Sequence, residues 1–597
     1  MHLQQRKRSC IRNLICDQST IQAAHFLISP LPNNLPVVMT LPVADDALFL
    51  GLDCSTQSMS AVVVDARGHV VYESSFRFDE RFPQYGTDNG VLRPKENEVV
   101  IPSLMFVESL DAIMDNLAKS PIDVTKIKSG SGSAQQHASV YWSKGFSLRV
   151  CLDAAAESGT ASMVEAMQKQ QESAFCLPNG PSWMDSSTTR YCTELEAAVG
   201  GPDRVAEISG SRAYERFTGN QIAKRIHEDP AFLEKCGRIA LVSSMLTSLL
   251  CGDYAPIDDS DGSGMNLLDV RKRVWSPELV KATTKYSTST NATEKLVAAL
   301  GSQVSRAYSS VSAIHTYFQK NYGFAADCKV IAFSGDNPCT LAGIGLSQPG
   351  DVGVSLGTSS TLFAVVPTEV ARFSGKEGHF FCNPIDPNSV MAMICFKNGS
   401  LTRQDVRDRR ASASWEKFEE LMQTTKTGNG GNTAFYYQDP EITPSTLKAG
   451  VVGFDASGAR INMSLSPPEV EVRAVVESQF LSLRLHAEKL GVNKPQRLIV
   501  VGGASANKCM LQVLANVFNA PVYRLTCASN SAALGGAFRA RHGFACAGSA
   551  SGYVPFDVSD SLDFSLSATP VDEDAKTYSN EIPRFESLEN QAVSLLS

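Results

Sequence analysis

The sequence predicts an α/β protein with two lobes and a cleft between them. Its 597 residues exceed what one hydrophobic core supports, because single cores stop growing at about 250–300 residues. Apolar, β-branched strands separated by a polar turn begin at Leu48, and a second pair of the same kind begins at Asp351. The two matching pairs indicate two similar lobes, each opening with a β-hairpin whose turn faces the cleft.

Composition narrows the class of protein. The chain is 43% hydrophobic and 19% charged, which is typical of a globular enzyme. Its formal charge is −8 and it has no long basic stripe, which argues against a nucleic-acid partner. The most apolar stretch, Ile239–Cys251, is too short for a membrane span and predicts a buried helix. The 15 cysteines form no C-x-x-C pair, which favours reduced thiols in the cytoplasm.

The two ends of the chain differ from its middle. Residues 1–46 form a basic extension in which Asp17 is the only acid before Met39. This pattern is that of an organelle transit peptide, or of a disordered extension that precedes a start at Met39, and we favour the second. From Val571 to residue 597 the chain is polar, which predicts a peripheral tail. The Ala-rich stretch Asp153–Gln171 predicts a surface insertion that carries a helix.

The elements between these ends follow a strand, loop and helix order. The first hairpin is followed by a third strand, and Ser103–Asp115 has helical periodicity. Three further units each place a strand before a loop or turn of small or polar residues: KIKSGSGSAQQH, then CKVIAFSGDNPCTLAGIGL, then RLIVVGGASANK. The last two continue into helices, and a final strand follows the third unit.

The turn of the first hairpin carries groups that suit a phosphate and its metal. Its strand ends in Asp53, whose carboxylate can hold Mg²⁺ through water. Ser55 and Thr56 add hydroxyls, and Gln57 adds an amide. The alternative is that Asp, Ser and Thr only close the hairpin, because they are common turn residues.

The second hairpin strengthens the phosphate interpretation. Its turn contains Gly357, Thr358 and Ser359, which could face the first turn across the cleft. Two opposed donor-rich turns and a metal are what phosphoryl transfer requires, since that reaction depends on positioning and charge stabilisation. The sequence contains no G-x-x-x-x-G-K-[ST] motif, which argues against a P-loop enzyme.

Asp336 is the candidate catalytic base. It follows a buried strand directly and starts a helix, which is where α/β sheets carry functional groups. Its carboxylate could accept the proton of an attacking hydroxyl, while Asn337 hydrogen-bonds another substrate oxygen. The alternative is a helix N-cap, for which both residue types are common. The two hairpins favour the catalytic role.

Other residues are candidates for binding a nucleoside and an acceptor. Gly502 and Gly503 lack side chains, so a flat base or ribose could approach the backbone, and Asn507 could hydrogen-bond it. A tight strand-to-helix turn explains the glycines equally well. Trp415 is a packing residue or an adenine contact, with packing preferred. For the acceptor the candidates are His137, Arg212, Arg216 and Asp185, each of which also has an ordinary structural explanation.

Taken together, these segments are similar to one known family. The chain resembles the FGGY carbohydrate kinases, and within them the eukaryotic xylulose kinases. The similarity is collinear over about nine tenths of the chain. It is carried by LFLGLDCSTQS, SAQQHASVYW, PSWMDSSTTRYCTELEAAVGG, GSRAYERFTGNQIAK, PIDDSDGSGMNLL, FSGDNPCTLAG, SLGTSSTLF, CFKNGSLTR, TGNGGN and VVGGASANK.

The resemblance implies a fold, a reaction and a set of roles. The fold is the two-lobed, actin-like ATPase (ribonuclease H-like) fold, with one domain over residues 47–345 and a nucleotide-binding domain over 346–570. The reaction is transfer of phosphate from ATP to the 5-hydroxyl of D-xylulose, with Mg²⁺. The implied sugar ligands are His137, Arg216, Asp336 and Asn337, with Asp336 as the base. The implied ligands of phosphate, metal and nucleoside are Asp53, Ser55, Thr56, Gln57, Gly357, Thr358, Trp415, Gly502, Gly503 and Asn507.

Two other functions fit the same motifs less well. A related kinase for ribulose, glycerol or another polyol would differ from a xylulose kinase only in pocket contacts. A catalytically silent sugar sensor would share the fold, but Asp53, Asp336 and both hairpin turns argue against it. The sequence leaves the oligomeric state open between monomer and homodimer.

Overall fold

The computed structural model describes residues 45–597, apart from 160–161, 171–172 and 526–529. The predicted N-terminal extension, residues 1–46, therefore lies outside the described residues up to residue 44.

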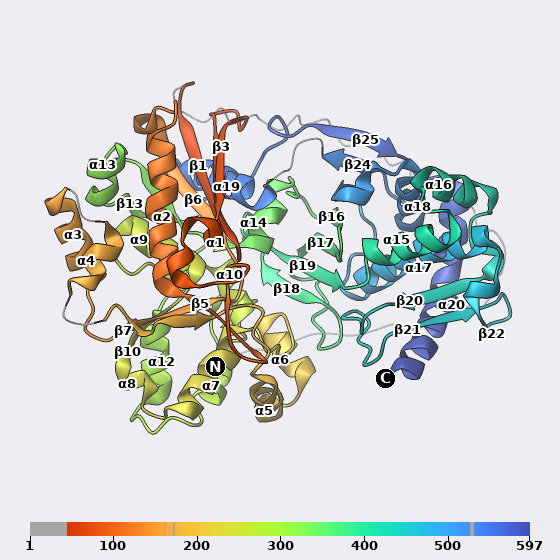
Figure 1. Cartoon of the computed structure of the whole chain (residues 1–597), viewed down its shortest axis with the longest axis horizontal. Coiled ribbons are helices and arrows are strands. Elements are labelled where there is room, and N and C mark those ends of the chain that lie inside the picture. The colour runs from red at the N-terminus through yellow and green to blue at the C-terminus, as the bar shows by residue number, and fades with distance from the viewer. Residues whose placement is uncertain (1–44, 160–161, 171–172, 526–529) are drawn as a thin grey trace, which may run out of the picture. The chain divides into compact units, whose positions relative to one another are not determined.

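Two seven-stranded sheets form the centre of the protein, and Figure 1 shows them with helices on their faces. The first sheet takes its strands from the N-terminal part of the chain: β13 (Ser310–Ala313), β14 (Lys329–Ile331), β6 (Ile127–Ala134), β1 (Leu48–Cys54), β2 (Ser58–Val64) and β3 (Val70–Arg77), with β15 (Ser334–Gly335) also paired with β6. Strands β1 and β2 are antiparallel neighbours, and β3 follows β2. The predicted first hairpin and its third strand are confirmed.

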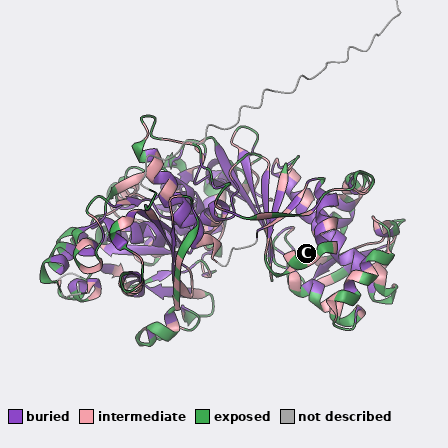
Figure 2. Ribbon diagram, turned by 90° about the horizontal axis from the view of Figure 1, so that it is seen from above, coloured by how far each residue is buried: buried purple, intermediate pink, exposed green. Residues whose placement is uncertain are grey.

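The second sheet also contains an antiparallel hairpin formed by its first two strands in sequence. Its order is β18 (His379–Cys382), β19 (Ser389–Phe396), β17 (Ser360–Pro367), β16 (Asp351–Leu356), β23 (Arg497–Val501), β24 (Val522–Leu525) and β25 (Phe564–Ala568). Strands β16 and β17 form an antiparallel pair, and β23 runs parallel to β16. The second predicted hairpin is therefore confirmed. The interior strands of both sheets are mainly buried, as the purple ribbons in Figure 2 show.

Helices cover the sheets, and smaller sheets extend them. The helices before the second sheet are α1 (Phe78–Arg81), α2 (Ser103–Ala118), α3 (Leu148–Ser158), α4 (Met163–Gln168), α5 (Thr189–Val199), α6 (Pro202–Ser209), α7 (Thr218–Glu228), α8 (Phe232–Lys235), α9 (Val242–Cys251), α10 (Asp259–Gly262), α11 (Pro277–Thr283), α12 (Ala292–Leu300), α13 (Thr316–Tyr322) and α14 (Asp336–Gly343). The later ones are α15 (Ser400–Arg410), α16 (Trp415–Thr424), α17 (Pro468–Lys489), α18 (Lys508–Phe518), α19 (Ser531–Gly548) and α20 (Asp572–Leu596).

The short strands form four additional sheets. Their members are β4 (Leu92–Lys95), β5 (Glu98–Pro102) and β9 (Asn179–Pro181); β7 (Ser139–Ser143), β8 (Phe175–Leu177) and β10 (Cys236–Leu241); β11 (Leu268–Asp269) and β12 (Val274–Trp275); and β20 (Thr433–Tyr437), β21 (Gly450–Phe454) and β22 (Arg460–Ile461).

Helix α19 joins the two halves of the chain. It lies between β24 and β25 of the second sheet in sequence, yet it packs against β1 and β6 of the first sheet and against α14 (Figure 1). The crossing of α14 and α19 requires glycine, because a Cβ on Gly535 would lie 1.8 Å from the carbonyl oxygen of Cys339. Apolar side chains from both sheets and from α14 and α19 form one shared cluster around this crossing.

Three segments differ from their sequence predictions. The stretch from Val571, expected to be peripheral, forms α20, which buries Tyr578, Phe585 and Leu588 against the core. Because these residues are spaced 7 and 3 apart, they share one helix face that the polar composition conceals. Residues 239–241 end strand β10, and the buried helix begins only at Val242.

The third difference is the predicted surface insertion. It is helical as predicted, but helices α3 and α4 bury one face in the core of the first half, including Ala156 and Met163. The backbone N–H of Met163 also donates to Asp111 Oδ2 at 3.0 Å. The insertion is therefore part of the packing of the first half.

The described cysteines are all free thiols, most of them buried. Across the part of the chain that the structure describes, none of the helices combines the length and the apolar character that crossing a bilayer requires.

Candidate active site

Three parallel strands of the first sheet end at one edge and bring the predicted residues together there. Asp53 lies at the end of β1, opposite Ser133 of β6, and Gly335 of β15 lies opposite Ala134. His137 follows β6 by three residues, and Asp336 follows β15 directly. The carboxyl ends of parallel strands are where α/β sheets place ligands, so this edge is the candidate active site.

Asp53 is held in one orientation by two hydroxyl groups. Ser133 Oγ donates to its Oδ1 at 2.6 Å, and Ser55 Oγ donates to its Oδ2. The carboxylate is 4% exposed, and burial raises its pKa although both hydroxyls lower it. A nearby cation would offset this desolvation cost.

In the rest of the first turn, one backbone bond closes the hairpin, and the side chains of Thr56 and Gln57 accept hydrogen bonds from other segments. The N–H of Ser55 donates to the carbonyl of Ser58 at 3.0 Å, which closes the hairpin. Gln57 Oε1 accepts from Arg77 at 2.8 Å. Thr56 Oγ1 accepts from Trp183 Nε1 at 2.8 Å, and this indole is 44% exposed. The turn-closing explanation is thus correct for part of the turn, and Ser55 also orients Asp53.

Asp336 starts helix α14 but does not cap it. The N-cap residue is Gly335, and no side chain provides a cap bond. Instead, Asp336 Oδ1 accepts from the N–H groups of Asn337 at 2.9 Å and Gln136 at 3.3 Å. Burial, together with the negative charge of Asp53, raises the pKa of Asp336 to about 7. A carboxylate with this pKa can accept a proton at neutral pH.

Gln136 connects the base to its neighbour and was not identified from the sequence. Its Oε1 accepts from Asn337 Nδ2 at 3.0 Å, while its backbone N–H binds Asp336. Its Nε2 is buried and has no hydrogen-bond partner among the described residues. A buried donor without an acceptor is costly, so a ligand oxygen that reached Gln136 Nε2 would remove this cost.

His137 is a neutral side chain with one free acceptor. Its Nδ1 lies 2.8 Å from the carbonyl oxygen of Gly264, which can only accept, so Nδ1 carries the proton and Nε2 has the lone pair. Burial, with the positive charge of Arg216, lowers its pKa to about 3. The ring stacks on Phe217 with centroids 4.4 Å apart. His137 can therefore accept a hydrogen bond from a hydroxyl group.

Of the other acceptor candidates, only Arg216 lies with His137. Its guanidinium stands 4.8 Å from the ring centroid of Tyr214 and 5.7 Å from that of Phe217. Arg212 pairs instead with Glu196 at 3.2 Å, which is the ordinary surface arrangement. Asp185 is buried and accepts from the N–H of Val99 at 2.9 Å, so its role is structural.

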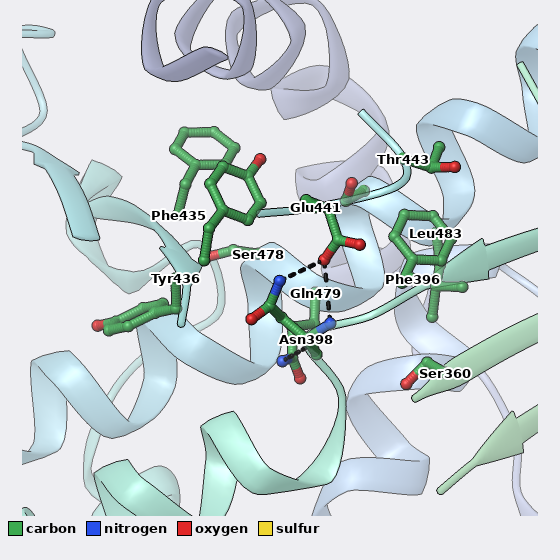
Figure 3. Close-up of a pocket in the computed structure, with 12 residues that line it drawn as sticks. Ser360, Phe396, Asn398, Phe435, Tyr436, Glu441, Thr443, Ser478, Gln479 and Leu483 are labelled. Atoms are coloured by element: carbon green, nitrogen blue, oxygen red, sulfur yellow. Dashed lines mark hydrogen bonds between the residues drawn. The ribbon is translucent and has the colours of Figure 1, made fainter. Parts of the chain in front are cut away.

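The turn of the second hairpin is fixed by a neighbouring loop. The N–H of Gly399 donates to the carbonyl of Thr358 at 3.1 Å, and that of Ser400 donates to the carbonyl of Gly357 at 2.9 Å. The loop itself is held by Glu441, a buried carboxylate that accepts from Asn398 Nδ2 at 2.8 Å and Asn398 N at 3.1 Å (Figure 3). Carboxylates bound by several N–H groups are rigid.

The residues around Glu441 line a cavity of about 30 Å³ (Figure 3). This volume suits a water molecule and is far too small for a nucleotide. Two of the residues that line the cavity, Glu441 and Asn398, hold the loop beside the second turn.

The glycine turn after β23 lies next to β16 because the two strands pair in parallel, with Ser355 opposite Val501. Gly502 has φ +94°, and a Cβ there would lie 2.9 Å from the backbone of Leu356. A Cβ added at Gly503 would meet no other atom within 4 Å. The tight-turn explanation therefore accounts for Gly502, whereas the space at Gly503 is open to a ligand.

The last two candidates have structural partners. Asn507 caps α18, with its Oδ1 accepting from the N–H of Met510 at 2.9 Å, which leaves its Nδ2 as a donor. Trp415 packs edge-on against Phe418 at 5.3 Å, with Arg407 over its ring at 4.7 Å. Packing explains Trp415, and its contact with adenine stays a prediction.

The residues at the first edge fit a magnesium ion delivered with phosphates. Mg²⁺ is usually bound by one or two carboxylates together with substrate oxygens and water. Asp53 supplies one buried carboxylate beside Asp336, and Ser55 supplies a hydroxyl. Among the described residues, no group of three or more His, Cys, Asp or Glu side chains could hold a metal by itself.

Family models match both halves of the chain. Residues 158–343 match the N-terminal domain of the FGGY family of carbohydrate kinases, and residues 352–544 match its C-terminal domain. The xylulose kinase of Mus musculus is 44% identical over 548 residues, covering 91% of this chain and 94% of that protein. Xylulose kinase 2 of Arabidopsis thaliana is 42% identical, covering 85% of this chain and 89% of that protein.

Solved structures show the same fold. A ligand-bound xylulose kinase from Lactobacillus acidophilus superposes with a TM-score of 0.71 at 17% identity, covering 92% of this chain and 100% of that one. The Plasmodium falciparum glycerol kinase with ADP superposes with a TM-score of 0.66 at 15% identity, covering 92% and 98%. These similarities confirm the predicted two-domain actin-like fold.

Proposed function

The chain belongs to the FGGY family of carbohydrate kinases, and on this premise we propose that it transfers the γ-phosphoryl group of ATP to the 5-hydroxyl of D-xylulose, with Asp336 as the general base. The observation that carries the proposal is the setting of Asp336 at the strand ends. It is oriented by Gln136 and Asn337, it lies beside Asp53, and its pKa is about 7.

Each group has a defined part in the reaction. Asp336 accepts the proton of the 5-hydroxyl as that oxygen attacks the γ-phosphorus. The new O–P bond forms while the bond between the γ-phosphorus and the bridging oxygen breaks, and ADP leaves with that oxygen. Asp336 then returns the proton to solvent. Because the carboxylate is largely buried and hydrogen-bonded in place, little reorganisation is needed when the substrate arrives.

The sugar would be held by donors and acceptors around Asp336. His137 Nε2 accepts from one hydroxyl, and Arg216 donates to sugar oxygens. Asn337 and Gln136 Nε2 lie next to the base and supply further amide groups. The stacked ring of Phe217 fixes His137, so the acceptor and the base keep their spacing.

ATP would be bound by both hairpin turns and by the glycine turn. We assign the phosphates to the turns and the adenosine to the domain over residues 346–570. The assigned residues are Ser55, Thr56, Gln57, Gly357, Thr358, Trp415, Gly502, Gly503 and Asn507. Asp53 would hold Mg²⁺, which neutralises phosphate charge when it is bound. We also propose a cytoplasmic location, which the free thiols support.

A panel of acceptors tests the proposal. The purified full chain is assayed with ATP and D-xylulose, D-ribulose or glycerol, and kcat/KM is compared. D-xylulose should give the highest value, and ³¹P NMR of the product should show a phosphate ester at carbon 5. A higher kcat/KM for ribulose or glycerol would show that D-xylulose is not the preferred substrate. Binding of D-xylulose without turnover would indicate a sugar sensor.

A further inference from the structure

Arg216 is a cation held without a carboxylate. Within the described residues it forms no ion pair, and the aromatic rings of Tyr214 and Phe217 lie against it. A hydrogen bond runs from one of its terminal nitrogens to His379 Nε2 at 3.0 Å. An arginine carries five N–H donors, so most of the donors of Arg216 are left for a ligand.

The bond to His379 has a defined direction. A guanidinium can only donate, so His379 Nε2 accepts and Nδ1 carries the proton. Nδ1 lies 3.0 Å from Ser211 Oγ, to which its N–H donates a hydrogen bond. His379 is 3% exposed, and burial, together with the charge of Arg216, holds its pKa well below the usual range. The neutral form that this arrangement requires is thus the stable form.

His379 comes from the other half of the chain. It begins β18, the edge strand of the second sheet, and lies 163 residues from Arg216. The strand is fixed to the first half by three bonds: Phe380 N to Gly210 O at 2.8 Å, Cys382 N to Ser263 Oγ at 3.0 Å, and Ser260 Oγ to Cys382 O at 2.6 Å. Its position is therefore rigid relative to Arg216.

The rings around His379 also pack against His137. Its imidazole lies 4.7 Å from Tyr214 and 5.8 Å from Phe217, the two rings that contact Arg216. Phe217 in turn stacks on His137. One packed group of rings thus connects His379, which accepts from Arg216, to His137, the predicted acceptor of a sugar hydroxyl.

We propose that His379 is a positioning residue for the sugar site: by accepting one hydrogen bond from Arg216, it fixes the guanidinium so that the other donors are preorganised for the ketose. This inference rests on the proposed function, because it requires Arg216 to bind the sugar. His379 is buried and would act through its hydrogen bond to Arg216, so the proposal does not require it to touch the substrate. Loss of a partner that orients a metal ligand costs about 10–100-fold in affinity or activity, and we expect a similar loss of sugar affinity here.

Three variants test the role through the KM for D-xylulose. His379→Leu removes the acceptor and should raise this KM about 10–100-fold, with the KM for ATP changed less than about twofold. His379→Gln places an amide oxygen near the position of Nε2 and should restore most of the affinity. His379→Asn reaches only the position of Nδ1 and should resemble leucine. Equal effects of glutamine, asparagine and leucine would overturn the proposal, as would a parallel rise in the KM for ATP.

A matched control and a double-mutant cycle separate positioning from general damage. His542→Leu removes another buried histidine, one that bonds the carbonyl of Val554 at 2.7 Å, and should leave the KM for D-xylulose unchanged. In an Arg216→Ala background, His379→Leu should have no further effect on this KM. If the factors by which the two substitutions raise the KM multiply in the double variant, His379 acts independently of Arg216 and the proposal fails.

The same variants distinguish failure of the two proposals. If Arg216→Ala itself leaves the KM for D-xylulose unchanged, then the assignment of Arg216 to the sugar is wrong. If His379→Leu does not fold, the glutamine and asparagine variants still decide, because they differ only in which ring nitrogen they replace.

Discussion

Replacing Asp336 by asparagine removes a proton acceptor while it keeps the local hydrogen bonds. An amide oxygen can still accept from the N–H groups of Asn337 and Gln136, which now bond the carboxylate. General base catalysis contributes about 10²–10⁴-fold. We therefore expect kcat to fall at least about 10²-fold, with the KM for D-xylulose and for ATP within a few-fold of the unmodified enzyme.

The same change should stabilise the folded protein at neutral and higher pH. The pKa of Asp336 is about 7, compared with an ordinary value of 3.8. Each pH unit between these values corresponds to about 1.4 kcal/mol, which gives an upper bound of about 4 kcal/mol. Because the carboxyl group is partly exposed to the site, we expect about half of this, about 2 kcal/mol.

The sign of the effect follows from proton linkage. The folded state binds the Asp336 proton more tightly than the unfolded chain, so its stability falls as pH rises from about 4 to about 7. Asparagine carries no charge and avoids this loss. The stability gain of the variant should therefore be complete at pH 8 and only about a third as large at pH 5, where the unfolded carboxyl is already ionised but the folded one is still protonated.

The assays are coupled ADP release for turnover, calorimetry for D-xylulose binding, and thermal unfolding at pH 5 and pH 8. Asp259→Asn is the control, because Asp259 is a buried carboxylate paired with Arg273 at 2.8 Å and Arg306 at 3.0 Å. Its removal should destabilise the protein by about 3–5 kcal/mol. Turnover of Asp336→Asn within tenfold of normal, or a lower unfolding temperature at pH 8, would refute the reasoning.

Three other outcomes are expected. Because Asp336 must be ionised to act, kcat/KM for D-xylulose should fall about tenfold per pH unit below about pH 7; a flat pH–rate profile would contradict this. Gly502→Ala should lower stability by about 1–3 kcal/mol and raise the KM for ATP, because φ is +94°, whereas Gly503→Ala should preserve the unfolding temperature; equal effects would count against the geometry. His486 lies between Glu377 and Glu589, whose hydrogen bonds outweigh the effect of burial and raise its pKa from 6.5 to about 9. Its stabilisation is fully present below about pH 6.5 and lost as pH rises through 9, so denaturant unfolding of His486→Gln should show no such loss between pH 6.5 and 9.

The turns and strand ends could be predicted from the sequence because their signals are local. Short apolar runs rich in β-branched residues mark β1, β2, β16 and β17, and polar or glycine residues mark the turns between them. Asp336 follows an apolar strand and begins a helix within a few residues. Such patterns depend on the backbone period and on turn chemistry, which a short stretch of chain contains entirely.

The partners of the site residues could not be predicted, because they are distant in sequence. Trp183, which donates a hydrogen bond to Thr56, lies 127 residues from it in the sequence. His379, which accepts a hydrogen bond from Arg216, lies 163 residues from it. No periodicity or motif connects these pairs. Arg216 and His379 meet only because edge strand β18 is bonded to the loops of the first half.

By itself, then, the sequence determined the α/β class, both hairpins and the chemical character of each turn, since these follow from local backbone preferences. Tertiary structure decided which groups are aligned, buried and charged. Sheet pairing set Asp53 opposite Ser133, and burial beside Asp53 raised the pKa of Asp336 to about 7. Desolvation and long-range contacts are properties of the packed molecule, so they become visible only in its three-dimensional structure.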